Sequence, residues 1–267
     1  MSTFRLVGVI HLPPLPCAVN YRGDSVGAMA DAAAEDARIL AAAGFTDVMI
    51  QDASDEPQPV TVDSPAVAAL SAIGAVVRRA TDVSLGVVIG HNDGAASVAV
   101  AHAIEAQFVR VKVLTGVSTG PTGWIEGCSM QVGMMKRLLG SSVEVWADAH
   151  EATSRAITGD VRWAAAEATS FGGADKVIVT RDSGVADAID DIASIRSALG
   201  RDIDILIGGR VNALTLEAAM RGSDGAILGS ALKDGDSYDA RIDPVAARLF
   251  GDGLRNFATV GDPRLFA

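Results

Sequence analysis

Short apolar runs alternate with longer, alanine-rich amphipathic segments along the whole chain. The short runs have β-branched or aliphatic centres and end in polar or glycine residues, which is typical of strands buried on both faces of a sheet. Eight strands are therefore predicted, at residues 5–11, 47–52, 84–90, 108–114, 144–150, 176–180, 204–208 and 226–229.

The segments between these strands show the start and stop signals of helices. Ser64 precedes Pro65, a cap followed by the residue that suits the first helical position, and Gly44 follows the first long segment. Eight helices are predicted, at residues 25–43, 65–80, 94–106, 128–139, 161–171, 186–199, 213–221 and 244–250.

The order of these elements predicts the fold. Eight strand–helix pairs without a Pro/Ser-rich linker indicate one domain spanning residues 1–267, an α/β protein with the eight-stranded parallel architecture of a (β/α)8 TIM barrel. A doubly wound open sheet is the alternative. Long links follow three strands, at residues 11–24, 52–64 and 115–127, so we expect the site on the face formed by the C-terminal strand ends.

Composition limits the location and the partners of the chain. Its mean hydropathy is +0.30, but its apolar runs are far shorter than the roughly 18 to 20 residues of a spanning helix, and no secretory signal is visible. A cytoplasmic protein without a membrane partner is expected. The net charge of −11 argues against nucleic-acid binding. Cys17 and Cys128 are too few for a disulfide framework or a zinc cluster.

Two glycine turns indicate a phosphate site. Gly208 and Gly209 follow the seventh predicted strand, and Gly229 and Ser230 follow the eighth. Glycine allows close approach of a ligand to the backbone, and N–H groups at helix starts attract anions. Barrels of this kind often bind phosphate with these two loops.

Acidic and histidine side chains end several predicted strands. Asp148 and His150 are two residues apart on one strand, which places them on the same face and suits acid–base catalysis. Replacing either should then abolish turnover without loss of the fold. His11 and Asp52 end the first two strands, where we expect them to contact the substrate. A structural role is the alternative for each.

Arg110 and Lys112 share one face of the fourth predicted strand. Because buried cations need partners, they should bind an anionic substrate or pair with Asp148 or Asp52. Lys112 could also serve as a Schiff-base amine. Asn92 and Glu126 lie beside strand ends and are expected to reach the substrate, although Glu126 would equally suit the start of the next helix.

No cofactor or metal is predicted. The chain has no P-loop, no strand-linked dinucleotide fingerprint and no zinc-protease or nucleophile-elbow motif. A divalent metal held by mixed nitrogen and oxygen ligands is the alternative. The candidate ligands lie on separate strands, so their spacing gives no specific support for such a site. The side chains that could form such a site are His11, Asp52, Asp148 and His150.

Several motifs resemble, in order, those of the BtpA/SgcQ family. They are VIHLPPLP at 9–16, ND at 92–93, VKVLTG at 111–116, EG at 126–127, ADAH at 147–150 and GSALK at 229–233. The resemblance implies a TIM barrel related to phosphate-binding sugar and nucleotide enzymes, with one branch linked to photosystem I biogenesis. The chain departs from the family pattern at Gln51-Asp52, His91, Lys112 and Thr180-Arg181. A divergent member with altered substrate or chemistry is therefore expected.

Together these features predict an enzyme for a phosphorylated pentose or nucleotide-like small molecule. The reaction classes left open are isomerisation or epimerisation, aldol-type lysis, and cleavage or formation of a ribosyl bond. A homo-oligomer is expected. The alternative is a non-catalytic assembly or regulatory factor. The fold alone does not decide between an enzyme and such a factor.

Overall fold

The computed structural model describes residues 4–157, 159–200, 202–233, 235 and 237–260. Eight parallel strands close into a barrel in chain order, the last pairing with the first. The barrel strands are β1 (Arg5–His11), β2 (Asp47–Gln51), β3 (Ser84–Val88), β4 (Phe108–Val111), β7 (Glu144–His150), β9 (Lys176–Val179), β10 (Asp204–Ile207) and β11 (Gly225–Leu228). The predicted single (β/α)8 barrel is confirmed.

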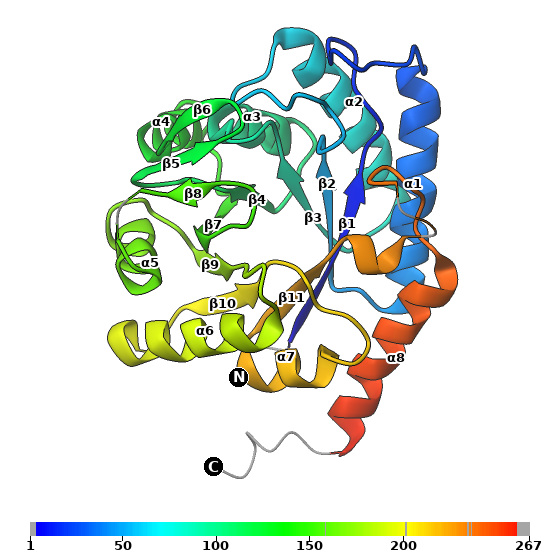
Figure 1. The fold of residues 1–267 in the computed structure, drawn as a ribbon. Helices are drawn as coiled ribbons and strands as arrows, with labels where there is room; N and C mark the ends of the chain where they lie inside the picture. Colours follow the sequence, from blue (N-terminus) through cyan, green and yellow to red (C-terminus); the bar gives the residue numbers. More distant parts are fainter. Residues whose placement is uncertain (1–3, 158, 201, 234, 236, 261–267) are drawn as a thin grey trace.

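Helices follow the barrel strands and surround them (Figure 1). They are α1 (Val26–Ala43), α2 (Ser64–Ala80), α3 (Gly94–Ala103), α4 (Ser129–Leu139), α5 (Val161–Ser170), α6 (Val185–Leu199), α7 (Leu216–Gly222) and α8 (Pro244–Val260), with a short 3-10 turn, η1 (Ser230–Leu232), before the last. In the described part of the chain, no helix has both the length and the apolarity needed to cross a membrane.

The predicted end of the eighth helix at residue 250 is wrong. Gly251 and Gly253 suggest a stop, yet α8 continues to Val260. A Cβ at Gly251 would lie only 1.8 Å from the Ala43 carbonyl oxygen, so this glycine serves close packing of α8 on the end of α1. Leu254 and Phe257 continue the apolar stripe and pack against the core.

Several predicted strands end early because side chains replace the backbone ladder. The strand predicted at 84–90 stops at Val88, and the Gly90 N–H donates to the carboxylate of Asp52. The strand predicted at 108–114 stops at Val111, and the Val113 N–H donates to the side chain of Asn92. Polar residues at strand ends thus tie neighbouring strands together.

The region 115–127, predicted as a loop, contains a β-hairpin. Its strands β5 (Val117–Gly120) and β6 (Gly123–Glu126) pair antiparallel, and β5 also pairs with β8 (Arg155–Ala156). Gly123 has a φ of 98°, which glycine adopts without strain at the turn. This small sheet lies beside the barrel strands, next to α4 (Figure 1).

Apolar side chains fill the barrel interior. Phe108 and Trp146 stack with ring centroids 3.7 Å apart, and Gly86 leaves room for the Phe108 ring, since a Cβ there would lie 2.1 Å from it. Met49 and Leu206 belong to the same buried cluster. The interior is therefore a packed core, and a ligand can enter only at its ends.

Candidate active site

A cavity of about 460 Å³ opens at the C-terminal ends of the barrel strands. This volume suits a small-molecule ligand. We call this cavity the central opening. Its polar and glycine lining includes His11, Gln51, Arg110, Lys112, Glu151, Thr180, Gly208, Gly209, Gly229, Ser230 and Tyr238.

All four residues of the predicted phosphate turns line the central opening. A Cβ at Gly208 would lie 2.0 Å from Oγ1 of Thr180, and a Cβ at Gly229 would lie 3.0 Å from Cε1 of His11. Glycine at both positions therefore permits a close approach between neighbouring strand ends. The Thr180 hydroxyl is buried and has no hydrogen-bond partner among the described residues.

Arg110 and Asp148 form a buried, bidentate ion pair. The guanidinium donates to the two carboxylate oxygens over 2.8 and 2.7 Å, and the Asp148 side chain is fully buried. Burial raises the pKa of Asp148, an effect that Arg110 opposes, and burial lowers the pKa of Arg110 while Asp148 more than restores it. Asp148 thus pairs with Arg110, one of the two partners expected for this arginine, and is not a free base.

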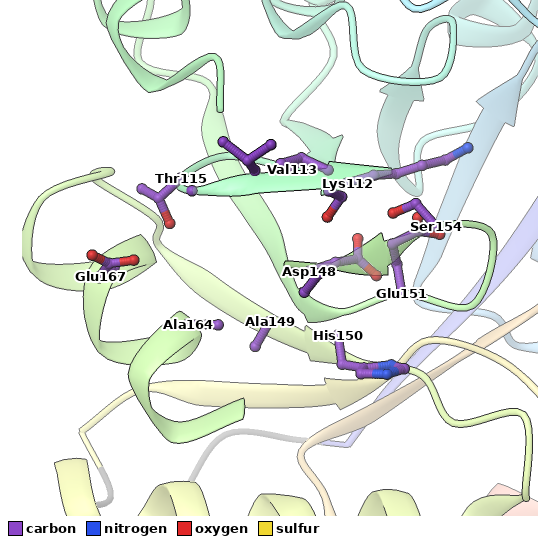
Figure 2. A pocket seen from close by; sticks show the side chains of 14 residues that line it. Lys112, Val113, Thr115, Asp148, Ala149, His150, Glu151, Ser154, Ala164 and Glu167 are labelled. Atoms are coloured by element: carbon purple, nitrogen blue, oxygen red, sulfur yellow. The ribbon is translucent and has the colours of Figure 1, made fainter. Parts of the chain in front are cut away.

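Asp148 and His150 do not share one face of the strand end as expected, although both line a small cavity of about 50 Å³. The register between β7 and β9 shifts between these two residues, so the alternation of side chains breaks at Ala149. His150 turns out of the central opening and its Nδ1 lies against the carbonyl oxygen of Thr180. Figure 2 shows its ring set apart from Lys112 and Glu151. The next residue, Glu151, lines the opening in its place.

Lys112 follows β4 and lines both the central opening and a smaller cavity of about 50 Å³ beneath the hairpin. The residue is 7% exposed, and no described residue gives its ammonium a hydrogen bond or an ion pair. Burial lowers the pKa of Lys112 and the nearby Arg110 lowers it further, while Glu151, Asp148 and Asp52 oppose the shift.

Glu151 is a carboxylate held at one oxygen by Thr153, while its Oε1 has no hydrogen-bond partner among the described residues. The backbone N–H and the hydroxyl of Thr153 donate to its Oε2 over 2.7 and 2.6 Å, and Nε2 of His91 lies 3.6 Å from Oε1. Ser154 lies beside it (Figure 2). Burial alone would raise the pKa of Glu151, but His91, Ser154 and Thr153 hold that pKa well below its usual range. This side chain was missed from the sequence because the register shift is not visible there.

His11 is an uncharged imidazole at one wall of the opening. Its ring stacks on Tyr238 with centroids 4.2 Å apart, and its Nδ1 lies 3.2 Å from the Tyr238 carbonyl oxygen. Burial lowers the pKa of His11 to about 3, helped by the charge of Lys233. Since a carbonyl only accepts, we assign the proton to Nδ1, which leaves Nε2, on the Gly229 side, as an acceptor.

Asp52 is a structural residue and does not line the central opening. Its carboxylate accepts the Gly90 N–H over 3.0 and 2.8 Å and a longer contact from Gln58. Burial raises the pKa of Asp52 to about 6. Gln51, one residue earlier, lines the opening instead. The structure thus places Gln51 at the opening and turns Asp52 away from it, because adjacent strand residues face opposite sides.

Asn92 and Glu126 also lie away from the central opening. The Asn92 amide is used fully by the backbone, since it donates to the carbonyls of Val113 and Glu126 and accepts the Val113 N–H. The Glu126 side chain is exposed at the end of β6. Both residues border a separate groove next to Trp124.

The possible metal ligands do not converge. His11 stacks on Tyr238, Asp52 caps Gly90, Asp148 binds Arg110 and His150 contacts Thr180. Across the described residues, no group of three or more His, Cys, Asp or Glu side chains is arranged to hold a metal ion.

Sequence comparison gives a family match over nearly the whole chain. The model of the BtpA family matches residues 3–255. An uncharacterised protein of Pyrococcus horikoshii is 34% identical over 230 residues, which cover 86% of this chain and 88% of that protein. The photosystem I biogenesis protein BtpA of Synechocystis is 28% identical over 254 residues, covering 93% of this chain and 87% of that protein.

Solved structures share the barrel at low identity. N-(5'-phosphoribosyl)anthranilate isomerase of Pyrococcus furiosus superposes with a TM-score of 0.57 at 11% identity, covering 95% of this chain and 99% of that one. Dihydropteroate synthase of Xanthomonas albilineans gives 0.57 at 16% identity, covering 96% and 92%. At such identities the likeness shows the fold alone.

Proposed function

The chain belongs to the BtpA family, and on that premise we propose that it is an enzyme that binds a phosphorylated sugar or nucleotide-like compound in the central opening. The chemistry is proton transfer or bond rearrangement on the sugar. Isomerisation or epimerisation, aldol-type lysis, and ribosyl-bond cleavage or formation all stay within this proposal. The substrate arrives as a small molecule, and the site is built by one chain.

One observation carries the proposal: the ammonium of Lys112. It is almost fully buried, it lines the central opening, and none of the described residues accepts its hydrogen bonds. A buried charged group without partners costs several kcal/mol of folding free energy, and such groups usually mark a binding site. Oxygen atoms of a substrate in the opening would accept these bonds.

The two glycine turns support phosphate binding at the opposite wall. Gly208 and Gly229 are packed so closely on Thr180 and His11 that the backbone itself forms this wall. The Gly208 N–H already donates to the Val179 carbonyl oxygen over 2.9 Å, so the phosphate would be bound by the N–H groups of Gly209, Gly229 and Ser230. The Thr180 hydroxyl, buried and without a partner, offers a further donor.

We assign the acid–base roles to residues other than Asp148 and His150. Lys112 carries the proton donors of the opening, Glu151 provides a fixed carboxylate, and Nε2 of His11 accepts a hydrogen bond from a substrate hydroxyl. The Arg110–Asp148 pair forms the floor beneath them and supplies a fixed dipole.

Thermal stability with matched ligands tests the proposal. Pentose phosphates and nucleotides are compared with their dephosphorylated forms, and a ligand at 100 times its Kd should stabilise the fold by about 2.7 kcal/mol. Gly229→Val should abolish the phosphate-dependent shift, because its side chain enters the space beside His11. Gly133→Ala is the matched control, since a Cβ there meets nothing within 4 Å. Equal shifts with and without phosphate would refute the phosphate site.

A second candidate function has its own observation. Met130, Met134 and Leu138 are four residues apart along α4 and are 70%, 67% and 78% exposed, so they form an apolar stripe on the surface. Such a stripe would suit an assembly factor that docks a partner protein, as the name of the Synechocystis relative suggests. A stoichiometric partner lost on Met134→Glu, with no phosphate-dependent stabilisation, would favour this reading.

Oligomeric state and compartment stay predictions. We expect a homo-oligomer, which light scattering of the purified protein measures directly. We also expect a cytoplasmic location, which fractionation of the source cells tests.

A further inference from the structure

The surroundings of Lys112 differ from those of the other lysines. The chain has four lysines, all in the described part, and of these Lys112 lines the central opening. Lys176 is bound by Glu144 and Asp204 at the opposite ends of the strands, over 3.4 and 3.3 Å. Lys136 lies on α4, outside the barrel. Lys233 is also buried with no hydrogen-bond partner for its Nζ among the described residues, and burial lowers its pKa to about 8, but it does not line the central opening. Of the four ammonium groups, that of Lys112 is therefore the one placed where a substrate would bind.

The neighbours of Lys112 favour a nucleophilic amine. Arg110 is fixed close by through its bidentate bonds to Asp148, so its positive charge cannot move away. Burial and this neighbouring cation both favour the neutral amine, which is the form that attacks a carbonyl carbon. Glu151, anchored by Thr153, supplies a fixed negative charge beside a cationic product.

We propose that Lys112 forms an imine with the carbonyl group of an open-chain substrate, so that the ligand of the central opening is a phosphorylated aldehyde or ketone. This inference rests on the proposed function and narrows its substrate class. It places the carbonyl carbon at Nζ of Lys112 and the phosphate at the glycine turns across the opening. Lys112 is then a catalytic residue, and Arg110 and Glu151 are positioning residues.

The step balances without a co-reactant. One ammonium proton leaves Nζ before the attack, the C–N bond forms, and the carbonyl oxygen takes that proton. The C–O bond then breaks, and the oxygen departs as water with a second proton from Nζ. The iminium that remains carries the single positive charge that the lysine carried before. Glu151 faces the same charge throughout, and the electron-poor carbon then favours loss of a neighbouring proton or cleavage of a neighbouring bond.

Trapping with borohydride tests the inference in the intact protein. Pyridoxal 5'-phosphate is the phosphorylated aldehyde probe, and pyridoxal is its partner without phosphate. After reduction, peptide mapping by mass spectrometry gives the extent of modification at each of the four lysines. We expect Lys112 to be modified about tenfold more than the others at limiting probe, the size of a 1.4 kcal/mol preference.

Two variants sharpen this experiment. Lys112→Arg keeps the positive charge but cannot form an imine, so it should lose the modification. Lys136→Arg is the matched control and should keep it. Even modification of all four lysines, or full modification of the Lys112→Arg variant at Lys233, would overturn the inference.

The outcomes separate the imine from the phosphate site. Equal modification of Lys112 by pyridoxal and by its phosphate would support the imine and count against the proposed phosphate turns. Phosphate-dependent thermal stabilisation without any adduct at Lys112 would overturn the imine and leave the proposed function standing.

Discussion

Replacing Asp148 with asparagine tests whether the floor of the central opening is a buried ion pair. The carboxylate is fully buried and binds Arg110 twice, over 2.8 and 2.7 Å. Asparagine keeps the shape but removes the charge, so the guanidinium is left buried without a counterion. If Asp148 served only in acid–base catalysis, its replacement should leave the fold intact. As a partner of Arg110, it should be costly to replace.

The expected cost follows from the two contacts. Asparagine still accepts one of the two hydrogen bonds at Oδ1, so the lost hydrogen bond to the charged group accounts for about 1.5–3 kcal/mol. Loss of the buried counterion adds to this, and breaking one side of a buried ion pair costs about 3–5 kcal/mol in total. The double variant R110M/D148N removes both charges and should cost no more than D148N alone. A coupling free energy of about 3 kcal/mol or more between the two positions is therefore expected.

Urea unfolding followed by far-ultraviolet circular dichroism measures these costs, with an unchanged slope showing that the same surface unfolds. Arg38→Ala is the control, because it breaks an exposed pair with Glu35 on α1 and should cost at most about 0.5 kcal/mol. The reasoning is refuted if D148N costs no more than this control. It is equally refuted if the double variant costs the sum of R110M and D148N.

Three further predictions concern the walls of the opening. Gly208→Ala should destabilise the fold by about 1–3 kcal/mol through its overlap with the Thr180 hydroxyl and a methyl group of Ile178, and adding Thr180→Ala should restore the part of that loss due to Thr180 in the same urea assay. His11 has a pKa of about 3 when folded, so protonation of the unfolded chain alone should lower stability as pH falls from about 6.5 towards 3, by up to about 1.4 kcal/mol per pH unit. His11→Asn should lack that portion, and parallel acid dependences of variant and wild type would contradict it. Lys112→Met should raise the stability of the ligand-free protein by about 1 kcal/mol while abolishing phosphate-dependent stabilisation in the thermal assay. A loss of stability instead would mean that the protein already satisfies the ammonium.

The barrel was predictable because its signal repeats. Each strand is a short apolar run buried on both faces. Helices begin and end at residues that favour helix ends, such as the Ser25 cap and Gly44 at the two ends of α1. The β5–β6 hairpin was missed because it interrupts the regular alternation of strands and helices. Its signal was local: β-branched residues on either side of a turn that ends at Gly123.

At the ends of β2 and β7, the side chain at the central opening lies one residue away from the candidate named from the sequence. On β2 the inward side chain at the opening is Gln51, which follows Met49 of the interior at a spacing of two. The same spacing of two on β4 correctly predicts that Arg110 follows Phe108 on the inward face. On β7 it fails after Asp148, because the register shifts, and no propensity in the sequence announces that shift.

Charge at the mouth of the barrel is arranged in levels, and this order supports the proposed chemistry. Above the stacked Phe108 and Trp146 rings, Arg110 and Asp148 satisfy each other's charges and hydrogen bonds, so neither is free to exchange protons with a ligand. In the level above them, some hydrogen-bonding groups have no partner among the described residues. Lys112 has donors without acceptors, and His11, held neutral by burial, has an acceptor at Nε2. A ligand that completes this level must accept hydrogen bonds at one end and donate at the other, which a hydroxylated carbonyl compound does.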